Sequence, residues 1–363
     1  MKFFQTLIAS VLGVFIALFI IFIIFFITIV SSTREPEPYI RDNSVLKINI
    51  SGNLPARQAS DPFDDLFNQN NGAGVSLQTL DENLSKAAVH DNIKGIWLEI
   101  DYVSGGWANL QEAHRMISTF RDSSDKFVYA STNDLGYNEK GYYLATAADS
   151  VFSPPESFFE FDGFYMQVMF YTGLFEKLGI EAEIARHGEY KSAVEPFMNK
   201  ELSEESRYQM SQLLEDLNSV FVEAVSQKTG KDAEEINGLI NDAPSLMAQY
   251  GYENGLIDSL LFPDQVVSLI KKRIGVEEDD DLNTVSNGRY YRVTPESAGL
   301  NPYSGSDRIA VIYASGMITF GTDGSNPFDT QPYITASFFE EQLEDILEDE
   351  DIKALVVRIN SPG

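Results

Sequence analysis

A lysine in an unusual setting is the first candidate for chemistry in this sequence. Lys191 follows a turn that contains Gly188, and small and apolar residues follow it as far as Phe197, whereas most lysines lie among charged and polar neighbours. An unprotonated lysine amine can accept a proton from a nucleophile, provided that burial lowers its pKa from about 10.4 to roughly 7 or 8. The spacing alone leaves two roles open, a general base and a solvated surface lysine.

Residue types that other catalytic and metal sites require are scarce. The sequence has no Cys and three His, so thiolate zinc sites and disulfides are excluded and a multi-histidine metal site is hard to assemble. Neither a P-loop nor a His-Glu-x-x-His motif is present, so we expect no metal and no cofactor. A Ser-His-Asp triad would need a histidine. His90 and His114 are expected on charged helix surfaces, which leaves His187 as the alternative base.

The composition is that of a folded, acidic protein. The 363 residues are 44% hydrophobic and 22% charged, which suits two or three domains with buried cores. With 26 Lys and Arg against 55 Asp and Glu, the formal net charge is -29, and such a surface repels the phosphates of nucleic acids. We therefore expect no nucleic-acid partner.

An uncharged segment near the N-terminus predicts a membrane anchor. Every residue from Leu7 to Val30 is uncharged, and a helix of this length would measure about 36 Å, enough to cross a hydrocarbon core of about 30 Å. A cleavable signal peptide has a shorter apolar region of about 7 to 15 residues. We expect a single-pass anchor in a bacterial inner membrane that contacts the lipid bilayer through these residues, with the bulk of the chain periplasmic. Because the flanking charges are balanced, the inverted topology with a cytoplasmic body stays open.

Two parts of the chain share the same landmarks in the same order. Each has a short strand-like run ending at Ser-Gly, then a helical pattern, then an apolar strand containing Ile-Lys. The first part has Val45 to Ile50, Leu77 to Val89 and Asn92 to Asp101, and the second has Ile309 to Ala314, Phe338 to Leu347 and Asp351 to Asn360. This order predicts a tandem duplication of an α/β unit with parallel strands, of which 95–100 and 354–359 are buried on both faces.

The chain is expected to divide into six parts. They are a short N-terminal flank (1–6), the anchor (7–30), a linker (31–44), the first copy (45–275), an acidic linker containing Gly and Pro (276–307) and the start of a truncated second copy (308–363). Within the first copy, Ser203 is expected to cap a long helix whose apolar stripe, from Leu213 to Val225, lies in the core.

The segment around Lys191 resembles a motif of a known family. Gly188 to Phe197 is similar to the Tyr-Lys-Ser-Ala-x-Glu-Pro-Phe motif of the long, 67K-type form of bacterial signal peptide peptidase, also called protease IV. The anchor and the duplication are shared with this family. Three further segments match it: Gly141 to Ala145 with Ala148 and Asp149, Asp162 to Phe164, and Arg358 to Gly363. The resemblance extends over essentially the whole chain.

The resemblance implies a Clp protease/crotonase-like α/β fold, preceded by one N-terminal transmembrane helix. It implies a membrane-anchored serine endopeptidase that degrades residual signal peptides and other membrane-associated peptides with a Ser-Lys dyad. Lys191 would be the general base, and the nucleophilic serine would lie beyond Gly363. Ser361 would belong to a turn near the oxyanion hole, and Glu139 would stand where the second copy carries its nucleophile. This chain would then be inactive alone, and the resemblance also implies a bowl-shaped homo-oligomer, a tetramer.

Two other functions stay open at this point. A crotonase-like enzyme acting on acyl thioesters would share the fold, although such enzymes normally work in the cytosol and the expected anchor argues against one. A non-catalytic membrane scaffold is the other alternative, because the expected nucleophile is absent from the sequence.

Overall fold

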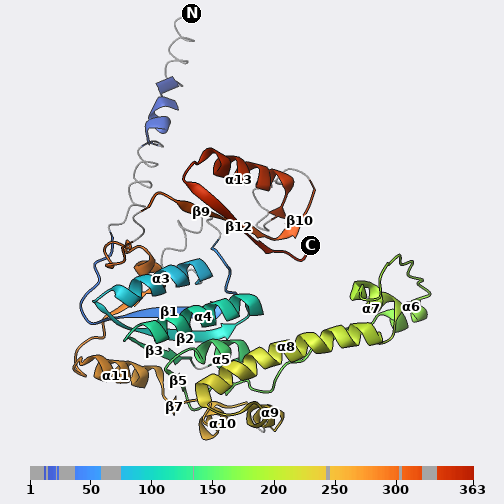
Figure 1. Cartoon of the computed structure of the whole chain (residues 1–363), viewed down its shortest axis with the longest axis horizontal. Coiled ribbons are helices and arrows are strands. Elements are labelled where there is room, and N and C mark those ends of the chain that lie inside the picture. Colours follow the sequence, from blue (N-terminus) through green and yellow to red (C-terminus); the bar gives the residue numbers. More distant parts are fainter. Residues whose placement is uncertain are drawn as a thin grey trace, which may run out of the picture.

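In the computed structural model of the chain, parallel strands form a six-stranded sheet in the order β7-β5-β3-β2-β1-β8 (Figure 1). Every neighbouring pair in this sheet is parallel, so the α/β class predicted from the alternation of strands and helices is confirmed. The strands are β1 (Ser44–Gly52), β2 (Ile93–Val103), β3 (Phe127–Ser131), β5 (Ser150–Ser153), β7 (Ser259–Leu260) and β8 (Thr284–Ser286).

The structure describes residues 12–13, 15–21, 23, 37–58, 75–133, 135–242, 246–301, 305–320 and 333–363. Most of the expected anchor and the linker as far as residue 36 lie outside these residues, and those that are described between Leu12 and Ile23 are helical. Within the described parts of the chain, no helix is both long and apolar enough to span a bilayer. The anchor stays a prediction.

Helices cover both faces of the main sheet. On one face, the apolar sides of α3 (Leu77–Val89), α4 (Trp107–Ser123) and α5 (Glu139–Ala145) form the larger core with alternate residues of β1 and β2. On the other face, Val266 and Ile270 of α11 (Pro263–Ile274) pack against Trp97 and Phe127. Because β2 is covered on both sides, its residues from Gly95 to Ile100 are buried except for the half-buried Glu99, as its continuous apolar run predicted.

Several short elements lie outside the six-stranded sheet. Two of them, β4 (Gly136–Tyr137) and β6 (Phe158–Phe159), pair with each other, as do β10 (Met317–Ile318) and β11 (Tyr333–Ile334). Two helices, α9 (Ala233–Asn241) and α10 (Ala248–Glu253), add residues to the larger core.

The second unit repeats the strand pair of the first. Strands β9 (Arg308–Ser315) and β12 (Ile352–Asn360) are parallel, and α13 (Ala336–Glu348) lies between them in the chain, as α3 lies between β1 and β2. The two ladders share an irregularity near their start and the register that follows it: Val45 pairs with Gly95 and Ile50 with Ile100 in the first, Ile309 with Ala354 and Ala314 with Ile359 in the second. Equal registers are what a duplicated unit would show.

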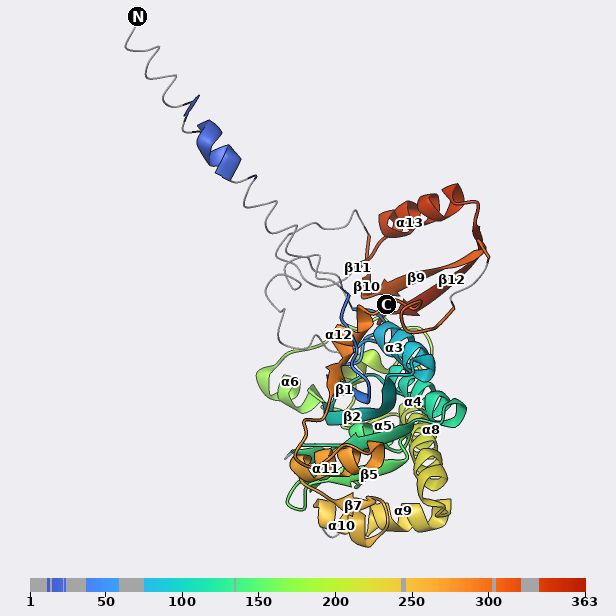
Figure 2. The ribbon, with the colours of Figure 1, turned by 90° about the vertical axis from the view of Figure 1, so that its left-hand side faces the viewer.

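The second unit differs from the first in burial. Residues 354–359 were expected to be buried on both faces, but in the structure they are exposed or half-exposed. The reason is that β9 and β12 form a sheet of two strands only, and no residue of α13 is itself buried. Figures 1 and 2 place this unit beyond α3, at one end of the main body.

The segment expected to be a solvated linker is partly folded onto the first unit. Residues 277–281 are exposed, as the acidic run predicted. The following β8 pairs with β1, and α12 (Asn287–Tyr291) packs on α3. There the fully buried Lys86 donates to the carbonyl oxygens of Tyr291 at 3.0 Å and Val293 at 2.9 Å, which holds the segment in place.

A long arm extends from the body and carries the segment around Lys191. It consists of α6 (Thr172–Leu178), the short helices η1 (Ser192–Val194) and α7 (Glu195–Met198), and the first half of α8 (Glu204–Thr229) (Figure 1). The prediction that α8 has a fully buried stripe is wrong for its first half. Leu213 is exposed, and the apolar stripe becomes buried only from Phe221 onward, because only the second half of the helix reaches the body.

Candidate active site

Lys191 lies at the tip of the arm, where a glycine turn meets a short helix. Gly188 has a φ of +101°, a backbone conformation that glycine adopts without strain, and its carbonyl accepts a hydrogen bond from the Lys191 N–H at 3.3 Å. Lys191 then precedes η1 as its N-terminal cap residue. Its side chain is exposed, and among the described residues its Nζ has no hydrogen-bond or ion-pair partner. The turn fixes the backbone of the lysine and leaves its amine free.

A buried carboxylate holds this turn to the rest of the arm. The Arg186 guanidinium donates long hydrogen bonds from Nη1 to the Lys191 carbonyl at 3.5 Å and to Glu195 Oε1 at 3.4 Å. Glu195 also accepts hydrogen bonds from the Ser203 hydroxyl at 2.6 Å and the Ser203 N–H at 3.2 Å. Ser203 in turn caps α8, as predicted, by accepting from the Ser206 N–H at 3.1 Å. The lysine turn is thereby tied to the start of the long helix.

The burial of Glu195 is exceptional for this part of the chain. Between residues 162 and 220, which are all described, the buried residues are Glu195 and Ser206. Burial raises the pKa of Glu195, but the hydrogen bonds from Ser203 and Arg186 outweigh it and keep the pKa below its ordinary value. The carboxylate is therefore ionised at neutral pH and acts as the polar centre of the arm.

Aromatic rings pack together just after the lysine turn. The ring of Phe197 stacks on those of Tyr171 and Phe175, with centroid separations of 5.6 and 6.2 Å. The Tyr171 N–H donates to the Pro196 carbonyl at 2.7 Å, so α6 is bonded to the residues that follow Lys191. Large apolar side chains elsewhere on the arm stay exposed, among them Tyr165, Met169, Leu178, Ile180 and Tyr190.

In the first unit, Glu139 opens α5 at the position where the resemblance places a nucleophile in the second copy. The Asn138 side chain caps this helix by accepting from the Gly141 N–H at 3.0 Å, and it donates to the Val103 carbonyl at 2.7 Å. Burial, with a hydrogen bond to Asp162, raises the pKa of Glu139 to about 7. A carboxyl group here cannot form the acyl-enzyme that a serine forms.

The raised pKa of Glu139 predicts a pH dependence of stability. Between the ordinary glutamate value of 4.5 and about 7, the folded state binds a proton that the unfolded state has lost, so stability falls as pH rises through this window. We expect Glu139→Gln to remove this slope and to make the protein more stable than wild type above pH 7. The measurement is the free energy of unfolding in urea, determined at intervals between pH 4.5 and 8. The matched control is Glu156→Gln, at an exposed position. Parallel curves for wild type and Glu139→Gln would contradict the assignment.

The three histidines occupy different environments. His187 is exposed on the arm, four residues before Lys191, and stays the alternative base. His90 ends α3, where its Nδ1 is 3.0 Å from the Tyr290 hydroxyl. The expectation of a surface position is wrong for His114, which stacks on Tyr143 at 4.7 Å, and burial lowers its pKa to about 4. His114 faces the core because α4 packs against α5 there.

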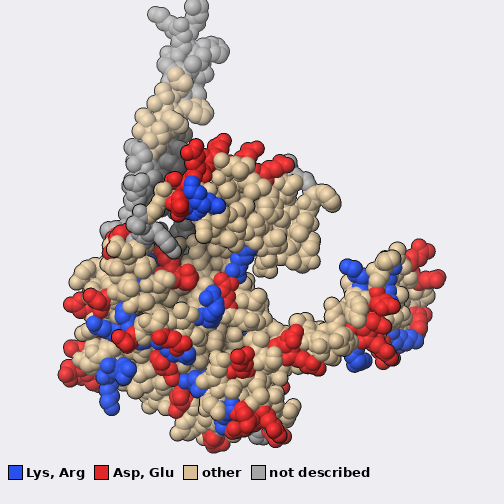
Figure 3. Space-filling model, in the orientation of Figure 1, with Lys and Arg blue, Asp and Glu red and all other residues tan. Residues whose placement is uncertain are grey.

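The end of β12 forms the turn that contains Ser361. The Gly363 N–H donates to the Ser361 hydroxyl oxygen at 3.0 Å, and the Asn360 carbonyl accepts from the Gly316 N–H at 3.0 Å. Ser361 thus accepts a local hydrogen bond just after β12, and its role stays a prediction. On the face shown in Figure 3, the arm with Lys191 projects from the body and stands clear of the second unit.

The middle of the chain is similar to a known protein family. Residues 121–277 match the model of the family described as peptidase family S49. Residues 121–277 are called the S49 segment below. The S49 segment includes Glu139, Lys191 and Glu195, so the resemblance noted in the sequence is confirmed at the level of the family.

The named relatives are proteases. The chain is 35% identical over 333 residues to the chloroplastic serine protease SPPA of Arabidopsis thaliana, a match that covers 90% of this chain and 46% of the relative. It is 28% identical to Protease 4 of Salmonella typhi, over 80% of this chain and 47% of that protein. The chain thus spans about half the length of these relatives.

Two solved structures are similar to this chain at low sequence identity. A membrane protease specific for a stomatin homologue, from Pyrococcus horikoshii, is 14% identical, with a TM-score of 0.31 over 68% of this chain and 91% of that one. An enoyl-CoA hydratase/isomerase family protein from Silicibacter pomeroyi is also 14% identical, with a TM-score of 0.32 over 56% of this chain and 73% of that one.

Proposed function

We propose that this protein is a serine endopeptidase in which Lys191 is the general base, and that its substrates are residual signal peptides and other membrane-associated peptides. The observation that carries the proposal is the position of Lys191 in the S49 segment, on a turn whose backbone is held by Arg186 and Glu195. A lysine used as a base must be held at a fixed position, because proton transfer requires hydrogen-bond distance to the nucleophile.

The proposal requires that another surface cover the arm during catalysis. A solvated lysine keeps its proton near neutral pH, and desolvation by apolar groups is the usual means of lowering a lysine pKa. Exposed apolar side chains surround the lysine turn, including Tyr190, Phe197 and Met198. A homo-oligomer, which the family resemblance suggests as a tetramer, would supply such a cover. The nucleophilic serine would come from the second copy, and an N-terminal anchor would hold the enzyme at the bacterial inner membrane with its body in the periplasm.

Peptide hydrolysis tests the proposed function directly. The protein, expressed from its complete reading frame in detergent or membranes, should cleave a synthetic signal peptide and should react covalently with a fluorophosphonate probe for activated serines. Acyl-thioester hydrolysis should be absent, which separates a peptidase from the crotonase-like alternative. A protein that binds neither probe nor peptide would instead favour the membrane scaffold.

A further inference from the structure

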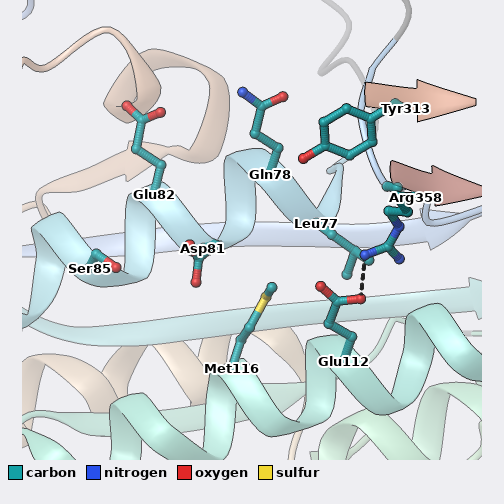
Figure 4. Close-up of a pocket in the computed structure, with 10 residues that line it drawn as sticks. Leu77, Gln78, Asp81, Glu82, Ser85, Glu112, Met116, Tyr313 and Arg358 are labelled. Carbon is teal, nitrogen blue, oxygen red and sulfur yellow. Dashed lines mark hydrogen bonds and ion pairs between the residues drawn. The ribbon is translucent and has the colours of Figure 1, made fainter. Parts of the chain in front are cut away.

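Two residues on neighbouring strands of the second unit contact the first unit. Tyr313 of β9 and Arg358 of β12 are partners in the parallel ladder. Tyr313 packs against the core of the first unit, and the Arg57 guanidinium lies 5.9 Å from the centre of its ring. Both residues line an open cavity of about 410 Å³, which α3 and α4 line from the other side (Figure 4). The contact therefore lies between the two repeated units.

Arg358 binds two residues on one face of α4. Its Nη1 is 2.7 Å from Glu112 Oε2, and its Nη2 donates to Asn109 Oδ1 at 2.9 Å (Figure 4 shows the first of these contacts). Asn109 and Glu112 are three residues apart, so both acceptors point the same way from the helix and match the planar fork of the guanidinium. Asn109 also donates to the Leu54 carbonyl at 2.8 Å, which anchors the acceptor itself.

The internal repeat shows that this arginine is not required by the strand-helix-strand fold. When the two ladders are matched by register, Tyr313 and Arg358 correspond to Asn49 and Glu99 of the first unit, which are likewise ladder partners. Glu99 carries the opposite charge and binds Lys47 of its own sheet at 2.9 Å. The second unit therefore has a cation at this position for a contact outside its own sheet.

We propose that Arg358 and Tyr313 form the joint that fixes the second unit on the first, with Asn109 and Glu112 of α4 as its receiving surface. Arg358 lies two residues before Asn360, where β12 ends in the turn to Gly363. The joint thus sets the position of that turn relative to the first unit, which carries Lys191. The joint stands on the contacts alone, and its effect on catalysis rests on the proposed function.

A distance measurement in the complete protein tests the joint. Residues 1–363 contain no Cys, so Thr119→Cys on α4 and Asp345→Cys on α13, both exposed, introduce two spin labels, and any Cys elsewhere in the complete protein is replaced by Ser. Double electron-electron resonance should give a narrow distance distribution for this labelled parent. Arg358→Glu and Glu112→Arg should each broaden it, because each variant places two like charges at the joint. The double variant Arg358→Glu with Glu112→Arg should narrow it again.

A control and a second readout separate the joint from other roles. Arg308, also in the second unit, binds Asp349 at 2.8 Å within that unit, so Arg308→Glu should leave the distance distribution unchanged. Peptide hydrolysis should fall at least about tenfold in kcat/KM in each joint variant and recover in the double variant. A parent-like distribution for Arg358→Glu, or no recovery in the double variant, would overturn the joint. If the labelled parent hydrolyses no peptide, the proposed function is wrong. The distance distributions then still test whether the joint exists.

Discussion

Replacing Lys191 with alanine is expected to abolish peptide hydrolysis by the complete protein, with a loss in kcat of at least about 10²- to 10⁴-fold. General bases contribute about this much, and in a dyad the base must also activate the nucleophile, so the loss can exceed the range. Lys191→Arg should be no better than alanine, because a guanidinium stays protonated and cannot accept the serine proton. The measurement is the rate of peptide cleavage by wild type and both variants between pH 6 and 10.

The arm offers a matched control for this experiment. Lys200 is also exposed on the arm and binds Glu176 at 2.8 Å, so Lys200→Ala removes a similar charge without touching the turn at Gly188. We expect Lys200→Ala to keep near wild-type activity. Because the Lys191 side chain has no partner among the described residues, its replacement should also leave the unfolding midpoint unchanged. Activity of Lys191→Ala equal to that of the control would return the role of base to His187.

The elements that the sequence predicts well are those whose pattern is decided locally. Ser76 and Thr79 form a reciprocal capping box, and α3 runs from Leu77 to Val89 as the apolar spacing indicated. The alternation in β1 and the apolar run in β2 likewise each predicted a strand. These patterns suffice for a correct order of elements in both units.

What the sequence could not predict depends on where each element lies in the molecule. The stripe from Leu213 to Phe221 has the period of a buried helix face, yet α8 reaches the body only after Leu213. Similarly, Val356 lies in an apolar run that is typical of a core strand. Its side chain is nevertheless about half exposed, because its sheet has two strands. Periodicity indicates which face of an element is apolar, and tertiary contacts decide whether that face is covered.

In the candidate site, too, the sequence indicated the local features and not the tertiary contacts. Lys191 stood out from its neighbours in the sequence, whereas nothing in the sequence paired Arg186 with Glu195 or assigned Glu195 a partner eight residues later in Ser203. The signal that was present, Ser203 as a helix cap, predicted only its bond to α8. Its second role, donation to a buried carboxylate, follows from the folding of the arm back on itself.

Replacing Glu195 with alanine is expected to lower kcat for peptide hydrolysis by about 10²-fold, although this residue does not take part in proton transfer. The carboxylate joins Arg186, and through it the Lys191 carbonyl, to Ser203 at the start of α8. Without it, the lysine turn loses its attachment, and a misplacement of about 1 Å in a reacting group costs about this factor. The matched control is Glu189→Ala, which removes an exposed carboxylate two residues before Lys191 and should leave kcat unchanged.

The ionisation of Glu195 gives a second readout that a simple loss of packing would not move. Because its folded pKa is lowered, the stabilisation of the arm is fully present above the ordinary value of 4.5 and is lost as pH falls through the folded value. Hydrogen exchange of residues 186–206, corrected for the intrinsic pH dependence, should therefore show wild-type protection that falls below pH 4.5. In Glu195→Gln, which has no charge to lose, residues 186–206 should be less protected than in wild type at pH 7. Their protection should not fall further below pH 4.5. Equal protection of the two proteins at pH 7 would show that the carboxylate does not hold the lysine turn.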